Sequence, residues 1–537
     1  MRLAIVDANL CEPKKCNNLC ARVCPRNKLK EKCIVIEDKA KIDENLCVGC
    51  GICANRCPFG AIKIINTPEK IGTLVYRYGE NKFALYNLPI PEKGHITGLI
   101  GRNGIGKTTA IKILAGEIKI DLEKLPTILK IYLKKERKIS YKPQVLRKVN
   151  FEEIDSKLAS YLNLKEKDNY SGGELQKLNI ALCLSKDADL YLLDEPSSYL
   201  DISERLKIAN LIKTKLKDKE VIIVEHDLAL LDYLSDRIYI LYGSPGAYGV
   251  VSTIYSTLKG INNYLNGYLP AENVRFRRDK IKFDIAVSEN LKKERLLSFT
   301  NLEKKLGSFV LRVKSGEIYK KEILGILGPN AIGKTSFMEI LASKISPDAG
   351  EVERVKISYK PQYLRADIDK LVKEIVPKTE EFKKQLAYPL GLNALYEKNI
   401  KDLSGGELQI LAIALCLSKD ADLYLLDEPS AFLDIENRLQ LTKILRKFVE
   451  INEKSMVVID HDLHLISQIS DRILFFRGKP KIEGRGEIIR SYDAINSFLK
   501  DFGITFRRDA ETGRFKANKP GSQLDVEQKK IGKYLEM

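Results

Sequence analysis

The chain has 537 residues, and its 90 Lys and Arg residues outnumber its 72 Asp and Glu residues, which gives a formal net charge of +18. A hydrophobic content of 44% and a charged content of 30% exclude a wholly disordered chain and predict globular domains. No apolar stretch is long enough to span a membrane, and the N-terminal residues lack the order of a signal peptide, so we expect a cytoplasmic protein with no membrane partner.

The excess of positive charge has two interpretations. It suits a polyanionic partner such as nucleic acid. A solvated, Lys-rich surface, as in heat-adapted proteins, explains it equally well. Charge alone does not decide between them.

The chain begins with a cysteine-rich segment, because nine of its eleven cysteines lie between Cys11 and Cys57. The spacing Cys47-x2-Cys50-x2-Cys53-x3-Cys57-Pro58 is that of a [4Fe–4S] ferredoxin, in which the fourth cysteine serves the other cluster of a pair. A wider-spaced run that ends at Cys24-Pro25 precedes it. We therefore expect two clusters, one held by Cys11, Cys16, Cys20 and Cys57 and the other by Cys47, Cys50, Cys53 and Cys24.

Structural zinc is the competing interpretation of these eight thiols, although zinc sites usually divide their cysteines into separated pairs. Cys33 is left over, and we expect it to pack in the interior. Cys183 and Cys416 occur far downstream in the same apolar context, ALCLS, and are expected to be small buried hydrophobic residues.

The rest of the chain is an internal duplication. Residues 180–197 and 413–430 have the same eighteen letters, IALCLSKDADLYLLDEPS, at an offset of 233. Four further words recur in the same order: GRNGIGKT with GPNAIGKT, ISYKPQ twice, SGGELQ twice, and EHD with DHD. So long a period indicates two copies of a domain rather than a repeat array.

Each copy opens with a phosphate-binding loop between an apolar strand and a helix. Glycines let backbone N–H groups close around phosphate, and the helix N-terminus adds partial positive charge. Ala331 replaces the middle glycine, Gly104, in the second copy and is expected to strain that loop slightly. The expected nucleotide-binding residues are Gly101, Asn103, Gly104, Gly106, Lys107, Thr108 and Thr109 in the first copy, and Gly328, Asn330, Gly333, Lys334, Thr335 and Ser336 in the second.

Both copies then place acids at the end of a buried strand, LYLLDE. In such a sheet ligands bind at the carboxyl ends of the strands. We expect Mg²⁺ to be held by the loop hydroxyl, the first acid and the glutamine after Lys-Pro, and the second acid and a histidine to act on water and the γ-phosphate. The expected Mg²⁺ residues are Thr108, Gln144, Asp194, Thr335, Gln362 and Asp427, and the expected catalytic residues are Glu195, His226, Glu428 and His461.

The word SGGELQ predicts a helix that begins with a serine cap and a glutamate three residues later. Two successive glycines weaken a helix, so we also expect a close approach to phosphate there. Aromatic residues upstream of the loops, Tyr78, Phe83 and Phe309, suit adenine stacking or core packing equally.

These motifs, in this order, resemble the nucleotide-binding domains of the ATP-binding-cassette family. The resemblance implies two α/β cassettes packed head to tail, with each ATP shared between one P-loop and the signature of the other cassette. It adds Ser171, Gly172, Gly173, Ser404, Gly405 and Gly406 to the ATP-binding residues.

Two Pro-containing, basic segments with the shared word FRRD, near 266–285 and after 500, indicate matched hinges or, for the second, a flexible tail. The predicted domains are therefore a ferredoxin-like head (1–65), a first cassette (66–265), a hinge (266–285), a second cassette (286–500) and a C-terminal hinge or tail (501–537).

A ferredoxin-like head fused to two cassettes resembles the E subfamily of ATP-binding-cassette proteins, the archaeal and eukaryotic ribosome recycling factors once called RNase L inhibitor. Its marks include the unequal cysteine runs, GYLPAEN at 267–273, and ITFRRDAETGRF with NKPGSQLD near the C-terminus. The resemblance implies a monomeric ATPase that uses ATP, Mg²⁺ and two [4Fe–4S] clusters. It also implies that the ribosome is split with a release-factor or Pelota-type protein, through contacts chiefly with the small subunit and its rRNA.

The first cassette departs from that family, because the spans from Lys107 to Gln144 and from Gln144 to Ser171 are short. This affects the expected grip on the small subunit and not the phosphate chemistry. The alternatives are a translation-factor ATPase without a cysteine head, an ATP-coupled redox enzyme, and a chromosome ATPase, which would need a long coiled coil. A further alternative is a soluble iron–sulfur ATPase of the same family with another ribosomal or nucleic-acid partner, in translation initiation or regulation.

Overall fold

The computed structural model of the chain describes residues 2–7, 10–43, 46–66, 72–283, 294–362 and 367–536. They form two compact units, one of residues 1–196, 212–225 and 234–280 and one of residues 197–211, 226–233 and 281–537. The predicted boundary between the hinge and the second cassette, at 285 and 286, lies outside the described residues.

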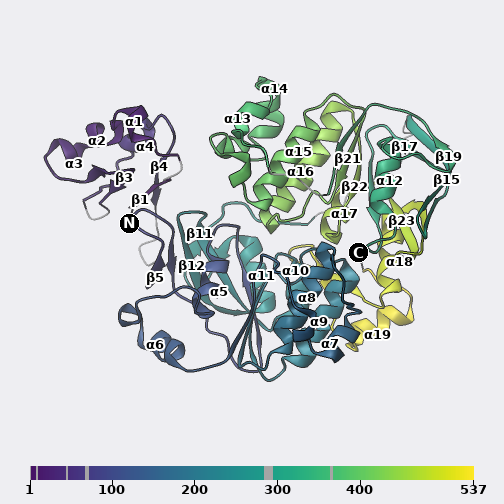
Figure 1. Cartoon of the computed structure of the whole chain (residues 1–537), viewed down its shortest axis with the longest axis horizontal. Coiled ribbons are helices and arrows are strands. Elements are labelled where there is room, and N and C mark those ends of the chain that lie inside the picture. Colours follow the sequence, from purple (N-terminus) through teal and green to yellow (C-terminus); the bar gives the residue numbers. More distant parts are fainter. Residues whose placement is uncertain are drawn as a thin grey trace. The chain divides into compact units, whose positions relative to one another are not determined.

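The head is a small α/β fold around the cysteines (Figure 1, purple). Strand β1 (Arg2–Val6) pairs antiparallel with β4 (Ile62–Asn66), and β2 (Ile34–Ile36) pairs with β3 (Ala40–Ile42). Its helices are α1 (Pro13–Cys16), α2 (Leu19–Val23), α3 (Pro25–Lys28) and α4 (Ile52–Arg56). Helix α3 begins at Pro25, because proline is well suited to the first helical position.

An eight-stranded sheet carries the first cassette, in the order β5-β6-β12-β11-β7-β10-β9-β8. The five strands from β11 to β8 are parallel. The strands are β5 (Leu74–Arg77), β6 (Ala84–Tyr86), β7 (Ile96–Ile100), β8 (Ile139–Lys142), β9 (Leu190–Asp194), β10 (Glu220–Val224), β11 (Arg237–Ser244) and β12 (Tyr248–Ser256). The helices are α5 (Lys107–Leu114), α6 (Thr127–Lys134), α7 (Ser156–Tyr161), α8 (Gly172–Ser185), α9 (Ile202–Lys215), α10 (Leu228–Leu234) and α11 (Thr257–Asn266).

The second cassette repeats this sheet as β15-β16-β24-β23-β18-β22-β21-β20 and adds β17 and β19, which both pair with β15. Its strands are β15 (Arg295–Leu306), β16 (Phe309–Val313), β17 (Gly316–Tyr319), β18 (Ile323–Leu327), β19 (Ala349–Val352), β20 (Ile357–Lys360), β21 (Leu423–Asp427), β22 (Ser455–Ile459), β23 (Arg472–Lys479) and β24 (Glu483–Arg490). Its helices are α12 (Lys334–Leu341), α13 (Val372–Ile375), α14 (Glu380–Phe382), α15 (Gly405–Leu417), α16 (Ile435–Asn452), α17 (Leu463–Ile469) and α18 (Ser491–Asp501).

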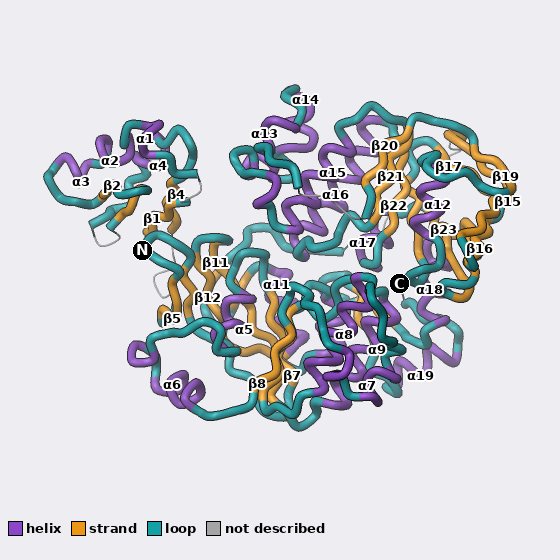
Figure 2. The backbone as a smooth tube through the Cα atoms, in the orientation of Figure 1, coloured by secondary structure: helices purple, strands orange, loops and turns teal. Residues whose placement is uncertain are grey.

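Both cassettes are organised by apolar central strands. Every residue of β7, β9, β18 and β21 is buried. Parallel strands need cover on both faces, which explains their continuous Ile and Leu content and the helices that flank each sheet (Figure 2). This arrangement brings the ends of β7 and β9, and of β18 and β21, to one edge of each sheet.

The segments expected to be linkers contain regular structure. Residues 268–275 form the hairpin of β13 (Tyr268–Leu269) and β14 (Val274–Arg275), and Arg277 Nη2 donates to the backbone carbonyl of Leu265. Near the C-terminus, β25 (Phe506–Arg508) pairs with β26 (Phe515–Ala517), followed by α19 (Gln523–Lys530). The described part of that segment therefore contains regular structure, and its assignment as a hinge or tail stays a prediction.

Where the first cassette is short in sequence, it is also sparse in structure. Helix α6 is its one α-helix between α5 and β8, and α7 is the one α-helix between β8 and α8. Among the described residues between β20 and α15, the second cassette has α13, α14 and three further short helical turns.

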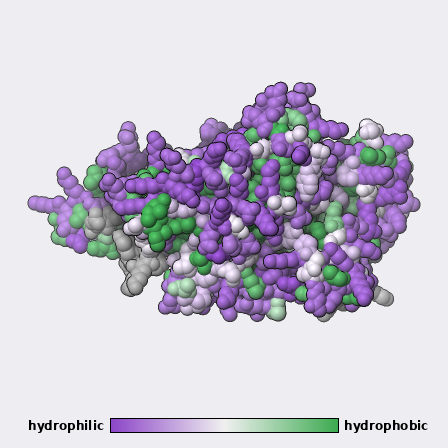
Figure 3. Space-filling model, turned by 90° about the horizontal axis from the view of Figure 1, so that it is seen from below, coloured by the Kyte–Doolittle hydropathy of each residue, from purple (hydrophilic) through white to green (hydrophobic). Residues whose placement is uncertain are grey.

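None of the helices in the described residues combines the length and apolar character that crossing a membrane requires. Figure 3 shows one face of the molecule, on which hydrophilic side chains predominate and hydrophobic ones form small scattered patches.

Candidate functional site

Glycines shape the P-loops because other side chains would not fit. Gly106 has φ +99°, and a Cβ there would lie 2.7 Å from Cζ of Phe83. Gly333 has φ +100°, and its Cβ would lie 2.7 Å from Leu311 Cδ1. The loops therefore turn tightly into the N-termini of α5 and α12, where free N–H groups favour phosphate.

The middle position of the loop differs between the copies, as the sequence indicates. Gly104 has φ +71° and Ala331 has φ +55°, so both adopt the left-handed conformation. An alanine there costs roughly 1–2 kcal/mol relative to its ordinary conformations. The second loop thus keeps the shape of the first and carries local strain.

The loop lysines are buried and bonded to their own loops. Lys107 Nζ donates to the carbonyls of Gly101 and Arg102 at 2.8 and 2.9 Å. Lys334 Nζ donates to Gly328 and Pro329 at 2.7 and 2.8 Å, and burial lowers the pKa of Lys334 to about 8. Burial disfavours the charged form of these lysines, and the negative charge of an incoming phosphate would stabilise it.

A hydroxyl and a carboxylate meet beside each loop. Thr108 Oγ1 donates to Asp194 Oδ2 at 2.9 Å, and Thr335 Oγ1 donates to Asp427 Oδ2 at the same distance. Burial, reinforced by the neighbouring glutamate, raises the pKa of each aspartate to about 6.

In each aspartate the other oxygen, Oδ1, is buried and has no hydrogen-bond partner among the described residues. A buried carboxylate oxygen left without a partner fits a divalent cation, and a loop hydroxyl with a strand-end aspartate is the usual Mg²⁺ pair of P-loop enzymes. Bound Mg²⁺ would neutralise charge on the β- and γ-phosphates.

The second acid of each strand contacts the glutamine that follows Lys-Pro. Gln144 Nε2 donates to Glu195 Oε1 at 2.7 Å, and Gln362 Nε2 donates to Glu428 Oε1 at 2.6 Å. The structure thus places these glutamines on the glutamates. Their expected role toward Mg²⁺ stays a prediction.

Histidine completes the second set. His461 Nε2 lies 3.4 Å from Glu428 Oε1. Burial alone would raise the pKa of Glu428, but its interactions with His461 and Lys334 and the hydrogen bond from Gln362 outweigh it and lower that pKa to about 2. His226 is buried just after β10, the position that matches His461 after β22.

The signature segments begin helices as expected. Ser171 and Glu174 form a reciprocal capping box at α8, and Ser404 and Glu407 form one at α15. The glycines have a packing reason as well, because a Cβ on Gly406 would lie 2.9 Å from the carbonyl oxygen of Phe432. Ser171 and Ser404 are exposed at the helix ends, and Gly172, Gly173 and Gly405 lie beside them.

The remaining nucleotide-binding candidates lie around the loops. Tyr78 is half exposed and bonds through its hydroxyl to Thr109 Oγ1 at 3.2 Å, whereas Phe83 and Phe309 are partly buried against the cassette cores. Phe83 and Phe309 therefore pack beside the last loop glycines, and adenine stacking stays a prediction for all three. Asn103 lies in the first loop, Asn330 in the second, and Ser336 in the first turn of α12.

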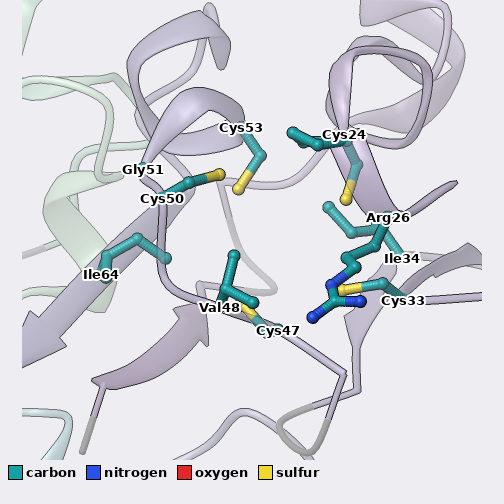
Figure 4. A pocket seen from close by; sticks show the side chains of 11 residues that line it. Cys24, Arg26, Cys33, Ile34, Cys47, Val48, Cys50, Gly51, Cys53 and Ile64 are labelled. Carbon is teal, nitrogen blue, oxygen red and sulfur yellow. The ribbon is translucent and has the colours of Figure 1, made fainter. Parts of the chain in front are cut away.

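In the head, two pockets collect the cysteines. One is lined by Cys24, Cys47, Cys50 and Cys53, and its sulfur atoms surround an open space (Figure 4). The other is lined by Cys11, Cys16, Cys20 and Cys57. Each pocket combines three cysteines of one run with one from the other, which is the grouping that the ferredoxin spacing predicts.

The thiols of these pockets need positive charge to ionise. Burial and the neighbouring cysteines raise the pKa values of Cys20 and Cys53 to about 11. Four thiols around about 330 Å³ of partly open space suit an iron–sulfur cluster, whose iron charge would stabilise the thiolates. No group of three or more His, Cys, Asp or Glu side chains in the described residues is arranged to hold a single metal ion.

Cys33 is buried, as expected, and it also lies next to the cysteines that are expected to bind a cluster. It lines the same pocket as Cys24 and Cys47 (Figure 4). Its position just before β2 gives no sequence signal of this contact.

Sequence reasoning also missed four buried donors. Lys142 and Gln176 bond to the backbone carbonyl of Glu195. Lys360 and Gln409 bond to that of Glu428. These four residues could have been found from the sequence, because they recur in both copies inside the words ISYKPQ and SGGELQ.

Fold and sites together define an ATPase with two ATP-binding cassettes behind an iron–sulfur head. The ABC transporter family model matches residues 88–198 and 311–431, the "possible Fer4-like domain in RNase L inhibitor" model matches 1–32, and the 4Fe-4S binding domain model matches 40–63.

Relatives match over the whole chain. An uncharacterized ABC transporter ATP-binding protein of Methanocaldococcus jannaschii is 45% identical over 99% of this chain and 97% of its own. Translation initiation factor RLI1 of Saccharomyces cerevisiae is 38% identical over 99% and 98%. A solved structure titled "Model of ribosome-bound archaeal Pelota and ABCE1" has a TM-score of 0.93 and 42% identity, and covers 100% of this chain and 99% of its own. The chain belongs to the ABCE1 (RNase L inhibitor) family and hydrolyses ATP.

Proposed function

We propose that this protein is a ribosome recycling factor, which uses ATP to separate large and small ribosomal subunits after termination or rescue. The observation that carries the proposal is the combination, in one chain, of two complete phosphate sites with a head that holds two cysteine pockets. The likeness over the full chain to a ribosome-bound ABCE1 supports the ribosome as partner.

ATP drives the cycle by binding more tightly to a closed arrangement of the cassettes. Each ATP is shared between one cassette's P-loop and the signature of the other, Ser404 to Gly406 for the first site and Ser171 to Gly173 for the second. A ligand shifts a conformational equilibrium only by its difference in affinity for the two states. Hydrolysis, in which Glu195 and Glu428 polarise water and His226 and His461 contact the γ-phosphate, then reopens the sites.

The head acts as a rigid lever. It binds two [4Fe–4S] clusters, one in each cysteine pocket, and closure moves it against a release-factor or Pelota-type protein. The pairing of cysteines from both runs in each pocket supports this role, because two clusters bound in this way tie the two halves of the head together.

The protein works in the cytoplasm as a monomer and binds chiefly the small subunit and its rRNA. The formal charge of +18 supports contacts with phosphates, which weaken as salt is added. The sparse first cassette, with α6 and α7 as its connecting helices, reduces the contribution of that cassette to the grip on the small subunit.

The test is sedimentation of matching ribosomes through sucrose with this protein, ATP and a Pelota-type factor, with iron assayed across the fractions. We expect separated subunits, with iron migrating with the small one. Intact ribosomes, with iron-loaded and ATP-hydrolysing protein left at the top of the gradient, would refute the proposal.

A role in translation initiation is the second candidate, because the yeast relative is named an initiation factor. It predicts iron on small subunits without any need for splitting. A matched reaction with isolated small subunits and no Pelota-type factor separates the two functions.

A further inference from the structure

In both cassettes, the glutamate proposed to polarise water has a backbone conformation that is rare for residues other than glycine. Glu195 has φ +49° and Glu428 has φ +48°, the left-handed region that favours glycine. A side chain leaves the backbone in a different direction there than from an extended residue. The carboxylates therefore depend on whatever holds this conformation.

Two buried donors hold it in the first cassette. Lys142 Nζ donates to the carbonyls of Asp194 and Glu195 at 2.9 and 3.2 Å, and Gln176 Nε2 donates to the Glu195 carbonyl at 2.8 Å. Lys142 is 1% exposed and Gln176 is fully buried. Lys142 lies at the end of β8 and Gln176 lies in the signature helix α8, so two different elements donate hydrogen bonds to the Glu195 carbonyl.

The second cassette repeats the arrangement. Lys360 Nζ donates to the carbonyls of Asp427 and Glu428 at 2.6 and 3.3 Å, and Gln409 Nε2 bonds to the Glu428 carbonyl. Lys360 and Gln409 are both buried. Both copies of the duplicated domain have therefore kept the same pair of donors, within the words ISYKPQ and SGGELQ.

These four donors are polar side chains at buried positions where apolar residues are usually found. A buried lysine without a carboxylate bonded to it is costly, and the amide oxygen of Gln176 has no hydrogen-bond partner among the described residues. Methionine or leucine would fill the same volume without that cost. The donors therefore have a purpose that apolar residues cannot supply.

We propose that Lys142 with Gln176, and Lys360 with Gln409, are positioning residues that clamp the backbone of Glu195 and Glu428 and so aim the carboxylates at the attacking water. The clamp also ties each signature helix to the glutamate of its own cassette. If a signature binds the ATP of the opposite site, as proposed above, occupancy there reaches this glutamate through one hydrogen bond. The inference rests on the assignment of the glutamates to hydrolysis.

The test measures one site at a time in the full chain. In a Glu428→Gln background, which traps ATP at the second site, single-turnover hydrolysis reports the first site, and Gln176→Met and Lys142→Met remove one donor each with little change of volume. We expect the single-turnover rate constant, taken here as kcat, to fall 10- to 100-fold for each, with the ATP concentration for half-maximal rate changed less than twofold and bound nucleotide recovered as ATP. Ser185→Ala, which removes two hydrogen bonds at the far end of the same helix, is the control and keeps the kcat of the Glu428→Gln background.

Three results would decide against the clamp. Native kcat in both methionine variants overturns it while leaving the glutamate assignment intact. A parallel loss of kcat, ATP binding and folded protein, seen by circular dichroism, reduces the donors to structural residues. If Glu195→Gln in the same background keeps native turnover, the glutamate assignment itself is wrong. Should Lys142→Met fail to fold, Gln176→Met and, in a Glu195→Gln background, Gln409→Met carry the test.

Discussion

Gln144 Nε2 lies 2.7 Å from Glu195 Oε1, so the glutamine of one strand end is already bonded to the carboxylate of its neighbour. The same contact joins Gln362 to Glu428 in the second cassette. The two strands are adjacent and parallel, which brings their carboxyl ends to one place.

Replacing either glutamate by glutamine should trap ATP. Glu195→Gln and Glu428→Gln each remove a carboxylate that accepts a proton, and loss of a general base costs roughly 10²–10⁴-fold in the rate of its site. Single-turnover hydrolysis and analysis of the bound nucleotide measure this. Gln144→Leu, which removes one hydrogen bond to the Glu195 carboxylate, should lower kcat less than Glu195→Gln does. Native turnover in the double glutamate variant would contradict the assignment.

The two loop glycines of the first cassette should differ in their tolerance of alanine. A Cβ on Gly104 would lie 3.5 Å from its nearest atom, so it fits. Gly104→Ala should therefore lower the free energy of unfolding only through the strain of an alanine in left-handed backbone, by about 1 kcal/mol. A Cβ on Gly106 lies 2.7 Å from the Phe83 ring, so Gly106→Ala adds overpacking and costs roughly 2–4 kcal/mol. Thermal unfolding and ATP binding check both variants.

The second loop provides the reverse experiment. Ala331→Gly removes a side chain from left-handed backbone and should stabilise the protein by up to about 1 kcal/mol. A lower melting temperature in this variant would show that Ala331 is not strained.

Cysteine variants should divide by pocket and not by position in the chain. Cys24→Ser and Cys53→Ser should alter the same cluster signal in the Mössbauer spectrum, because both residues line one pocket. Cys57→Ser should alter the other signal, although Cys57 follows Cys53 by four residues. Each variant should lose about half of the iron, the amount expected when one of two clusters is lost.

Cys33→Ser is the matched control in the first pocket, and we expect it to retain full iron. Loss of half the iron from this variant would identify Cys33 as a ligand. Iron loss from both pockets after any single substitution would show that they do not bind separately.

The signature helix α15 should lose stability in acid. Burial opposes ionisation of Glu407, but Lys398 and the Ser404 N–H and hydroxyl outweigh it and lower its pKa. A lowered folded-state pKa means that this stabilisation is present above the ordinary value of 4.5 and is lost as pH falls through the lower value.

Glu407→Gln should therefore cost about 1 kcal/mol near neutral pH, and the difference from the native protein should shrink below pH 4. Unfolding free energies measured across that range test it. A difference that does not change with pH would mean that the carboxylate charge contributes nothing.

Most of the candidate phosphate-binding and cluster-binding residues could be predicted from local sequence. The words GRNGIGKT and LYLLDE predict loop, strand and acid because each depends on a local rule: glycine permits the turn, and continuous apolar residues require a buried strand. The cysteine runs predict which four thiols group together, because ferredoxin spacing has few solutions. Linkers were harder, since a short hairpin such as 268–275 has no strong hydrophobic period.

Contacts between segments that are far apart in the chain could not be predicted from the sequence. Cys33 shares a pocket with Cys47, Gln144 bonds to Glu195, and Lys142 and Gln176 bond to the carbonyl of that glutamate. These contacts join elements that are distant in sequence and follow from the order of strands in the sheet and the packing of α8 beside it. A buried lysine or glutamine has no pattern in sequence that names its partner, because the hydrogen bond is set by where two chain segments cross.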